Sequence, residues 1–182
     1  MKKSIGLIEL NSIARGIEAA DNMLKAANVE IVFSTATCPG KYMTLIFGDI
    51  SAVENSIKSG KNVGAENVVD DLIIPNVDEQ IFPAITGTTV IDEVKAVGVI
   101  ESFAIASLII AADACVKAAN VKLMEMRLGS GIGGKSYAVM TGDVADVKAS
   151  VEAGVNAIKA SGNIVNYTVI PSPHKDFKRI LM

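Results

Sequence analysis

The sequence holds few of the residues that build most catalytic and metal centres. It has no tryptophan, two cysteines and a single histidine, His174, which follows two prolines near the end of the chain. No helical pattern carries paired histidines or cysteines at the spacing of metal ligands, so neither zinc nor hydrolytic chemistry is indicated. With only Cys38 and Cys115 available, we expect a reducing compartment and no disulfide framework.

Basic and aromatic residues are also scarce. The net charge is −3 and aromatic residues make up 4% of the chain, so the basic surface and stacking rings of nucleic-acid-binding proteins are missing. The longest apolar runs are interrupted by Glu101 and Asp113 and are too short to cross a membrane. Residues 1–10 begin like a signal peptide, but Glu9 interrupts the apolar run and no cleavage site follows. These features predict a cytosolic protein that binds neither nucleic acid nor membranes.

What the sequence does have is an apolar content of 50% over 182 residues, enough for a buried core, and an internal duplication. Shifted by 92 positions, the segment from Ile5 aligns with the segment from Val97, and the run Lys25 to Val29 recurs as Lys117 to Val121. From Gly40 onward the shift is 94, so the second copy has two extra residues in one loop. The chain is therefore two copies of one domain.

Both copies show the same order of periodic segments. In the first, strands are predicted over 4–10, 29–36, 42–48 and 67–75; one helix carries Ile13, Ile17, Ala20 and Leu24 on one face, and another runs from its cap Asp49 to Gly60. In the second, strands are predicted over 96–102, 121–128, 136–142 and 163–171, with helices over about 103–118 and after residue 143.

This order predicts an α+β fold. Each copy is a β-α-β-β-α-β, ferredoxin-like domain, in which helices pack on one side of an antiparallel sheet. We place the first repeat at residues 1–75, a linker at 76–94, and the second repeat at 95–182, including a short tail after Pro173.

A glycine-rich segment, residues 129–136, fits the phosphate-binding pattern G-x-x-x-x-G-K-[ST]. That pattern needs a helix after it, because a helix N-terminus supplies the amides and dipole that hold the phosphates. Here a strand is predicted instead, and the first copy has "TATCPGKY" at the same place. The pattern favours a hairpin tip, and an NTP-binding protein that uses Lys135 is the less favoured alternative.

The two cysteines occupy different settings. Cys115 lies in a helical pattern and aligns with Met23, so we expect a buried apolar residue. Cys38 lies at the tip between two strands, beside Pro39 and three residues before Lys41, a cation that would favour the thiolate.

Several charged residues recur between the copies. We expect Glu9, Glu101, Asp21 and Asp113 to be solvated or interface charges. Lys25 and Lys117 are expected to be exposed cations at helix ends, where the dipole favours them.

The recurring text, from "G-x-I-E" through "AAD…KAANV", "GK" and "GD" to "VIP", resembles the bacterial microcompartment (BMC) shell domain, twice and over almost the whole chain. Two tandem, unpermuted copies resemble the tandem-domain shell proteins, in which three chains form a pseudohexagonal tile with a pore on its three-fold axis. "TCPGKY" and "GIGGKSY" resemble the propanediol-utilisation type, whose pore carries an iron-sulfur cluster on one cysteine per subunit.

The resemblance implies a structural shell protein rather than an enzyme, located in the microcompartment shell. It implies a homotrimer that holds a [4Fe-4S] cluster on three Cys38 thiolates, for electron transfer or cluster supply. The partners that it implies are other shell proteins, packed edge to edge, and a lumenal redox enzyme. Lys41 is expected to offset the cluster charge. The alternative is a cluster-free trimer with a gated pore for small metabolites. The residues implied as pore loops are Pro39, Gly40, Lys41, Ser130, Gly131, Ile132, Gly133, Gly134 and Lys135.

The edge contacts implied by the resemblance are Lys25 and Lys117, which the family pairs with an arginine in "IPRPH". This chain departs from that pattern, with Ser172 in "IPSPH" and Asn76 in "IPNV". We therefore expect the lysines to bond to backbone carbonyls across the edge without that arginine.

Overall fold

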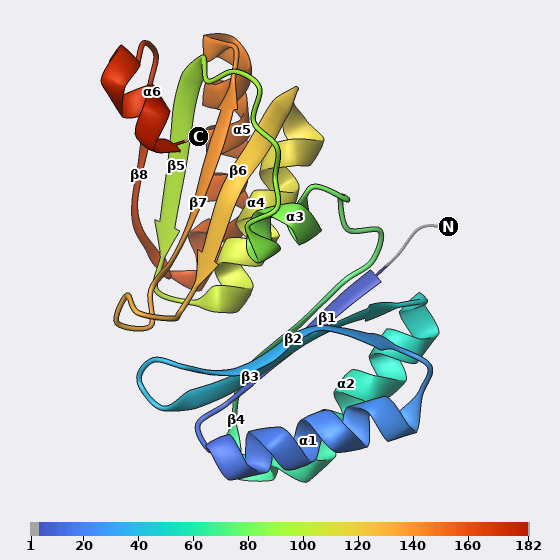
Figure 1. Cartoon of the computed structure of the whole chain (residues 1–182). Coiled ribbons are helices and arrows are strands. Elements are labelled where there is room, and N and C mark those ends of the chain that lie inside the picture. Colours follow the sequence, from blue (N-terminus) through green and yellow to red (C-terminus); the bar gives the residue numbers. More distant parts are fainter. Residues whose placement is uncertain (1–3, 182) are drawn as a thin grey trace. The chain divides into compact units, whose positions relative to one another are not determined.

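The structure is a computed structural model that describes residues 4–181. The chain divides between Val77 and Asp78 into two compact units. Each unit contains a four-stranded antiparallel sheet with two long helices on one face (Figure 1). The predicted α+β fold and its tandem β-α-β-β-α-β order are therefore confirmed. In the described residues, no helix is long and apolar enough to cross a membrane.

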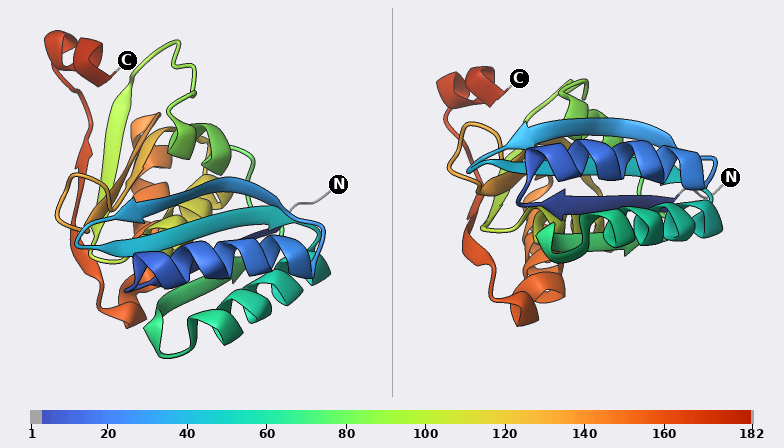
Figure 2. Two further views of the ribbon diagram at one scale, coloured as in Figure 1. Left: turned by 60° about the horizontal axis from the view of Figure 1, so that its bottom comes forward. Right: turned by 90° about the horizontal axis from the view of Figure 1, so that it is seen from below.

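The first unit follows the predicted order closely. Its elements are β1 (Ser4–Leu10), α1 (Ile13–Ala26), β2 (Glu30–Thr37), β3 (Lys41–Gly48), α2 (Ile50–Gly64) and β4 (Val68–Ile74). The strand order is β2-β3-β1-β4, which places β1 in the interior of the sheet and leaves β2 and β4 at its edges. Figure 2 shows α1 and α2 side by side on one face of this sheet.

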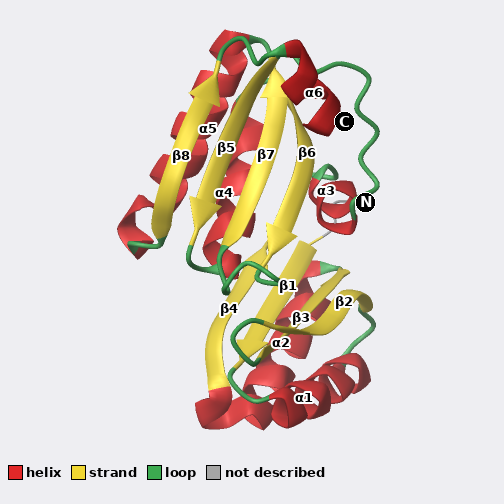
Figure 3. Cartoon of the chain, turned by 60° about the vertical axis from the view of Figure 1, so that its left-hand side comes forward, coloured by secondary structure: helices red, strands yellow, loops and turns green. Residues whose placement is uncertain are grey.

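The second unit repeats this arrangement and adds two short helices. Its elements are α3 (Ile81–Thr86), β5 (Ala96–Ser102), α4 (Ile105–Ala118), β6 (Val121–Leu128), β7 (Ser136–Gly142), α5 (Val144–Ile158), β8 (Ile164–Ile170) and α6 (Lys175–Leu181). The strand order is β6-β7-β5-β8, with α4 and α5 behind the sheet (Figure 3).

The helix α3 lies in the segment that we predicted as a linker. This helix packs against the edge strand β6. Gln80, the residue before α3, makes two side-chain hydrogen bonds to the backbone of β6. Its Nε2 donates to the Val121 carbonyl at 3.3 Å, and its Oε1 accepts from the Leu123 amide at 3.0 Å. The helix α6 lies in the predicted tail, where its Leu181 packs against the sheet cluster of Val94, Val97, Met124 and Val139.

The two long helices of each unit approach closely at a glycine. A Cβ on Gly60 would lie 2.7 Å from the Met23 sulfur, and one on Gly154 would lie 2.4 Å from the Cys115 sulfur. Helix α2 continues through Gly60 to Gly64, so our prediction that it ends at Gly60 was wrong. Gly60 is required for close helix packing rather than for a helix end. Cys115 is fully buried at this contact, as expected.

The same contact is reinforced by a buried hydroxyl in each unit. Ser56 Oγ donates to the Met23 carbonyl at 2.9 Å, and Ser150 Oγ donates to the Cys115 carbonyl at 3.0 Å. These bonds fix the rotation of each helix about its axis and so decide which face of α1 points into the core. The first core comprises Ile8, Leu10, Ala19, Met23, Ile46, Val53 and Ile57.

Replacing Gly154 with alanine should destabilise the protein. The new methyl would lie 2.4 Å from the Cys115 sulfur and 2.9 Å from the Ala111 carbonyl oxygen, so the helices must separate. We expect a loss of about 1–3 kcal/mol in the free energy of unfolding, larger than the gain in helix propensity. Urea denaturation at a fixed protein concentration measures it. In a Cys115→Ala background the loss should shrink, and undiminished stability of Gly154→Ala would contradict this packing.

Two helix N-termini differ in detail from the predictions. Asp49 occupies the N-cap position of α2, but its carboxylate makes no capping hydrogen bond. The helix predicted from about Phe103 starts at Ile105, because the Ser102 hydroxyl accepts from the Ala104 amide at 3.2 Å and holds this entry in a turn.

Candidate functional site

The first tip loop, residues 38–40, joins β2 to β3. Its turn is closed by the Gly40 amide, which donates to the Thr37 carbonyl at 2.9 Å. Gly40 has a φ of +90°, which favours glycine, and a Cβ there would meet open space. Cys38 is a free, partly exposed thiol next to Pro39 at this tip. The loop thus presents one thiol per chain at the tip of a hairpin.

The second tip loop, residues 129–135, joins β6 to β7 and carries no cysteine. It is shaped by four glycines with positive φ: Gly129, Gly131, Gly133 and Gly134. The Gly129 amide donates to the Lys135 carbonyl at 3.0 Å and closes the loop. Because the strand β7 follows, no helix N-terminus is available to hold a phosphate. The loop is a hairpin tip, as the sequence favoured.

An ion pair lies at the base of each tip loop. Lys41 Nζ lies 3.0 Å from Glu9 Oε1, and Lys135 pairs with Glu101 in the same way. The Glu9 side chain is only 4% exposed, so our prediction of a solvated or interface charge was wrong for this residue. The register of β1 against β3 brings Glu9 toward the start of β3. The charge of Lys41 is therefore balanced within its own chain and is not free to offset another group.

Two further groups near the tips are unusual. The Thr37 hydroxyl, next to Cys38, and the Ser136 hydroxyl, next to Lys135, are buried without a hydrogen-bond partner in the described structure. Asp70 lies opposite Glu9 across the β1–β4 pair, and partial burial raises the pKa of its carboxyl, an effect that the Asp71 amide opposes. The tip of the first repeat thus combines a thiol, an unpaired hydroxyl and closely spaced carboxylates.

The recurring lysines lie at the opposite helix ends from the tips. Gly16, near the start of α1, faces Tyr42 beside the first tip loop, whereas Lys25 lies in the last turn of this 14-residue helix. Such a helix is about 21 Å long. Lys25 pairs with Asp21 and Lys117 with Asp113, each four residues earlier. Asp113 is buried, which also contradicts the solvated reading.

The sequence did not indicate that one apolar helix face would remain exposed. Ile13 and Ile17 of α1 are 43% and 54% exposed, and Leu24 is 43% exposed. The counterparts of Ile13 and Ile17 in α4 are buried, with Ile105 at 1% and Ile109 at 0%, and Val116, the counterpart of Leu24, is partly buried. The helix spacing correctly predicted α1, but Ala20 is the one residue of the predicted face that is buried, and α1 packs through Gly16, Ala19, Ala20 and Met23.

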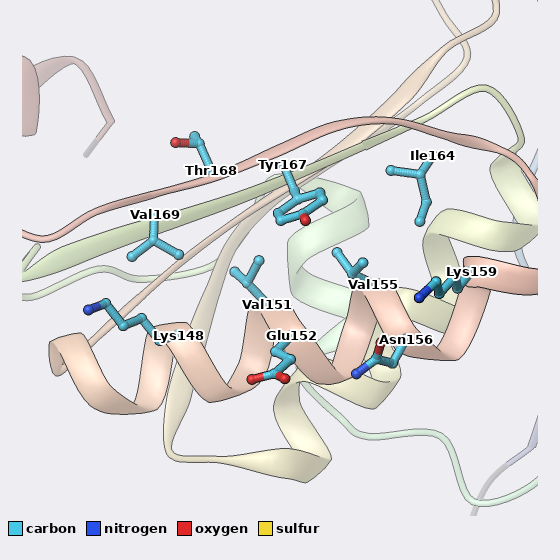
Figure 4. A pocket seen from close by; sticks show the side chains of 10 residues that line it. All are labelled: Lys148, Val151, Glu152, Val155, Asn156, Lys159, Ile164, Tyr167, Thr168 and Val169. Carbon is cyan, nitrogen blue, oxygen red and sulfur yellow. The ribbon is translucent and has the colours of Figure 1, made fainter.

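A groove of about 760 Å³ in the second unit lies between α5 and the edge strand β8 (Figure 4). Tyr167 and Val169 point into it from β8, above Val151 and Val155 of α5. Its charged residues are Lys148, Glu152 and Lys159, and it contains no cysteine or histidine. It offers no nucleophile–base pair and so no catalytic constellation.

Comparison with known proteins agrees with this geometry. The BMC domain family model matches residues 4–77 and 96–173. The bacterial microcompartment shell protein PduT of Citrobacter freundii is 42% identical over 179 residues, covering 98% of this chain and 97% of that protein. The crystal structure of a microcompartments protein from Desulfitobacterium hafniense superposes with a TM-score of 0.94 at 53% identity, covering 98% and 99% of the two chains. A fused permuted hexameric shell protein of the RMM microcompartment shares the fold, with a TM-score of 0.64 at 21% identity over 88% and 86% of the chains.

Proposed function

This chain belongs to the BMC-domain family of bacterial microcompartment shell proteins, and from that premise we propose that it forms a homotrimeric tile whose central pore holds a [4Fe-4S] cluster on Cys38. Its relatives are structural proteins, and the chain is a shell component and not an enzyme. In this tile the two tip loops of every chain line the pore.

Unequal burial of equivalent residues supports the trimer. On the helix side, Ile17 is 54% exposed while Ile109 is 0% exposed. On the sheet side the order reverses: Leu7 is 0% exposed and its counterpart Val99 is partly exposed. The first repeat thus leaves an apolar helix face exposed, and the second repeat leaves Val99 only partly covered on its sheet. Two different complementary surfaces make a head-to-tail contact, which closes into a ring when the rotation allows it.

The chemistry of the cluster also favours three chains. A cubane cluster normally takes four cysteine ligands, and residues 4–181 contain no group of three His, Cys, Asp or Glu that could hold a metal. Three Cys38 side chains on a three-fold axis supply three thiolates and leave one iron for another ligand. The second tip loop has no cysteine, so the ring offers three thiols and not six.

Cys38 fits such a group, because its free thiol is partly exposed at the hairpin tip. When bound, the cluster supplies one-electron transfer, which is the proposed activity across the shell or toward a lumenal redox enzyme.

Iron and sulfide analysis of anaerobically purified protein, together with sedimentation velocity, tests this proposal. We expect a trimer with about one cluster per three chains. A stable monomer would contradict the tile. A trimer that takes up no iron on anaerobic reconstitution would instead favour the cluster-free metabolite pore.

Edge packing gives a separate prediction. If tiles contact other shell proteins through Lys25 and Lys117, the double variant Lys25→Ala, Lys117→Ala should remain trimeric but assemble poorly into sheets. Lys25 is an exposed cation that contributes little to the fold, whereas Lys117→Ala also leaves the nearly buried Asp113 carboxylate without its cation and lowers the stability of the second unit. Electron microscopy of sheets and sedimentation of trimers measure the two effects. Unchanged sheets would show that the edges are held by other residues.

A further inference from the structure

We infer that Asp113 is a positioning residue that fixes Lys117, so that the two kinds of tile edge are not equivalent. The edge of the second repeat presents a lysine held in one geometry, and the edge of the first repeat presents a mobile one. This inference rests on the proposed role of both lysines as edge contacts.

The two aspartate–lysine pairs have equal spacing but different surroundings. In the first repeat, the side chains of Asp21 and Lys25 are 56% and 71% exposed, and the described structure gives Asp21 no other partner. In the second repeat, the side chain of Asp113 is only 9% exposed and that of Lys117 is 44% exposed. An exposed pair barely restricts a lysine, whereas a buried carboxylate cannot turn away from its partner.

Both carboxylate oxygens of Asp113 are engaged. Oδ1 accepts the Asp78 amide at 2.9 Å, and Oδ2 accepts Lys117 Nζ at 2.5 Å. Asp78 is itself anchored, because its side chain accepts the Gln80 amide at 3.0 Å and Gln80 is bonded to β6. The position of the Lys117 ammonium is thus set through Asp113 by the segment before α3.

A fixed ammonium suits directed bonding to a neighbouring tile. An ammonium has three N–H donors, and Asp113 uses one, so two remain for acceptor oxygens across the edge, either carbonyl or carboxylate. Lys25 must lose more side-chain freedom to make the same contact. We therefore expect edges of the second repeat to form first and to tolerate fewer partners.

The matched variants Asp113→Asn and Asp21→Asn test this inference on the intact trimer. An asparagine at 113 keeps an oxygen for the Asp78 amide but removes the charge that holds Lys117. Acetylation of individual lysines by a succinimidyl ester, followed by peptide mass spectrometry, reports how freely each amine reacts. In the unmodified chain we expect Lys117 to react about threefold or more slowly than Lys25. Asp113→Asn should remove that difference, and Asp21→Asn should change Lys25 by less than about twofold.

Sheet assembly gives the functional readout. Asp113→Asn should raise the protein concentration needed for sheets by about 3–10-fold, with Asp21→Asn within about twofold of the unmodified chain. Asp113→Glu, which keeps the charge, should restore part of the loss. Equal reactivities of Lys25 and Lys117 in the unmodified chain would overturn the inference, and this measurement does not depend on the folding of any variant. Equal effects of Asp113→Asn and Asp21→Asn would also overturn it. If instead Lys25→Ala with Lys117→Ala leaves sheets unchanged, the edge role itself fails, whatever the reactivities.

Discussion

Replacing Cys38 with serine is expected to abolish cluster binding completely. The variant is purified anaerobically and reconstituted in parallel with the unmodified protein. It should be colourless and hold less than about a tenth of the iron that the unmodified protein holds. The effect is large because one substitution removes all three thiolates of the ring. The trimer should persist, since Cys38 lies at a hairpin tip and contributes little to the core. Visible absorption, iron content and sedimentation measure these outcomes.

Cys115→Ser is the matched control for this experiment. Cys115 is fully buried, and burial raises the pKa of its thiol to about 12, so it stays protonated at neutral pH and is a poor metal ligand. The variant should keep the cluster but lose about 1–3 kcal/mol in the free energy of unfolding, because a hydroxyl replaces a sulfur in a packed helix contact. Iron retained in Cys38→Ser, or lost only in Cys115→Ser, would contradict Cys38 as the ligand.

Replacing Ile17 with aspartate should convert the trimer into monomers. Ile17 is the most exposed residue of the apolar face on α1, and in the proposed ring it lies against the next chain. A carboxylate buried there would lack a partner, so the dissociation constant should rise by about 100-fold or more. The monomer itself should remain folded, since the side chain is 54% exposed before assembly. Sedimentation velocity across a concentration series, with circular dichroism, separates the two effects.

Val90→Asp provides the comparison. Val90 is 72% exposed and lies outside α1, so an added charge there should leave the trimer unchanged. Ile109→Asp is unsuitable, because Ile109 is fully buried and its replacement should unfold the second unit. A trimer of Ile17→Asp that survives at micromolar concentration would show that this face of α1 is not the contact between chains.

The duplication and the order of elements could be predicted from the sequence because they depend on local periodicity. The face that α1 buries could not be predicted, since Ile13, Ile17 and Leu24 form one helical stripe and Gly16, Ala19 and Met23 form another. The second stripe is the buried one, because Gly16 contacts Tyr42 and Met23 contacts Gly60 so closely that neither glycine can be replaced by a larger residue. The buried face of α1 is set by close contacts with other elements, and the hydropathy of the sequence does not reveal those contacts.

The candidate site was likewise predictable only in part. Cys38 could be placed at a tip because turn residues surround it. The partners of the recurring charges could not, because Glu9 and Lys41 are distant in sequence and meet only through the register of two strands. The short helices α3 and α6, of six and seven residues, are too short to show a period.

The Gln80 side chain has a consequence for how the protein avoids misassembly. An open strand edge can recruit a strand from another molecule and start aggregation, a hazard at the high local concentration of a growing shell. Along β6, the amide of Gln80 occupies hydrogen-bonding groups of Val121 and Leu123 that an incoming strand would need. The corresponding edge of the first sheet, β2, instead carries the exposed charge of Glu30. Pairing with a strand of another molecule is thereby discouraged at β6 and at β2. Growth of the shell then depends on side-chain contacts between tiles, which form and break reversibly.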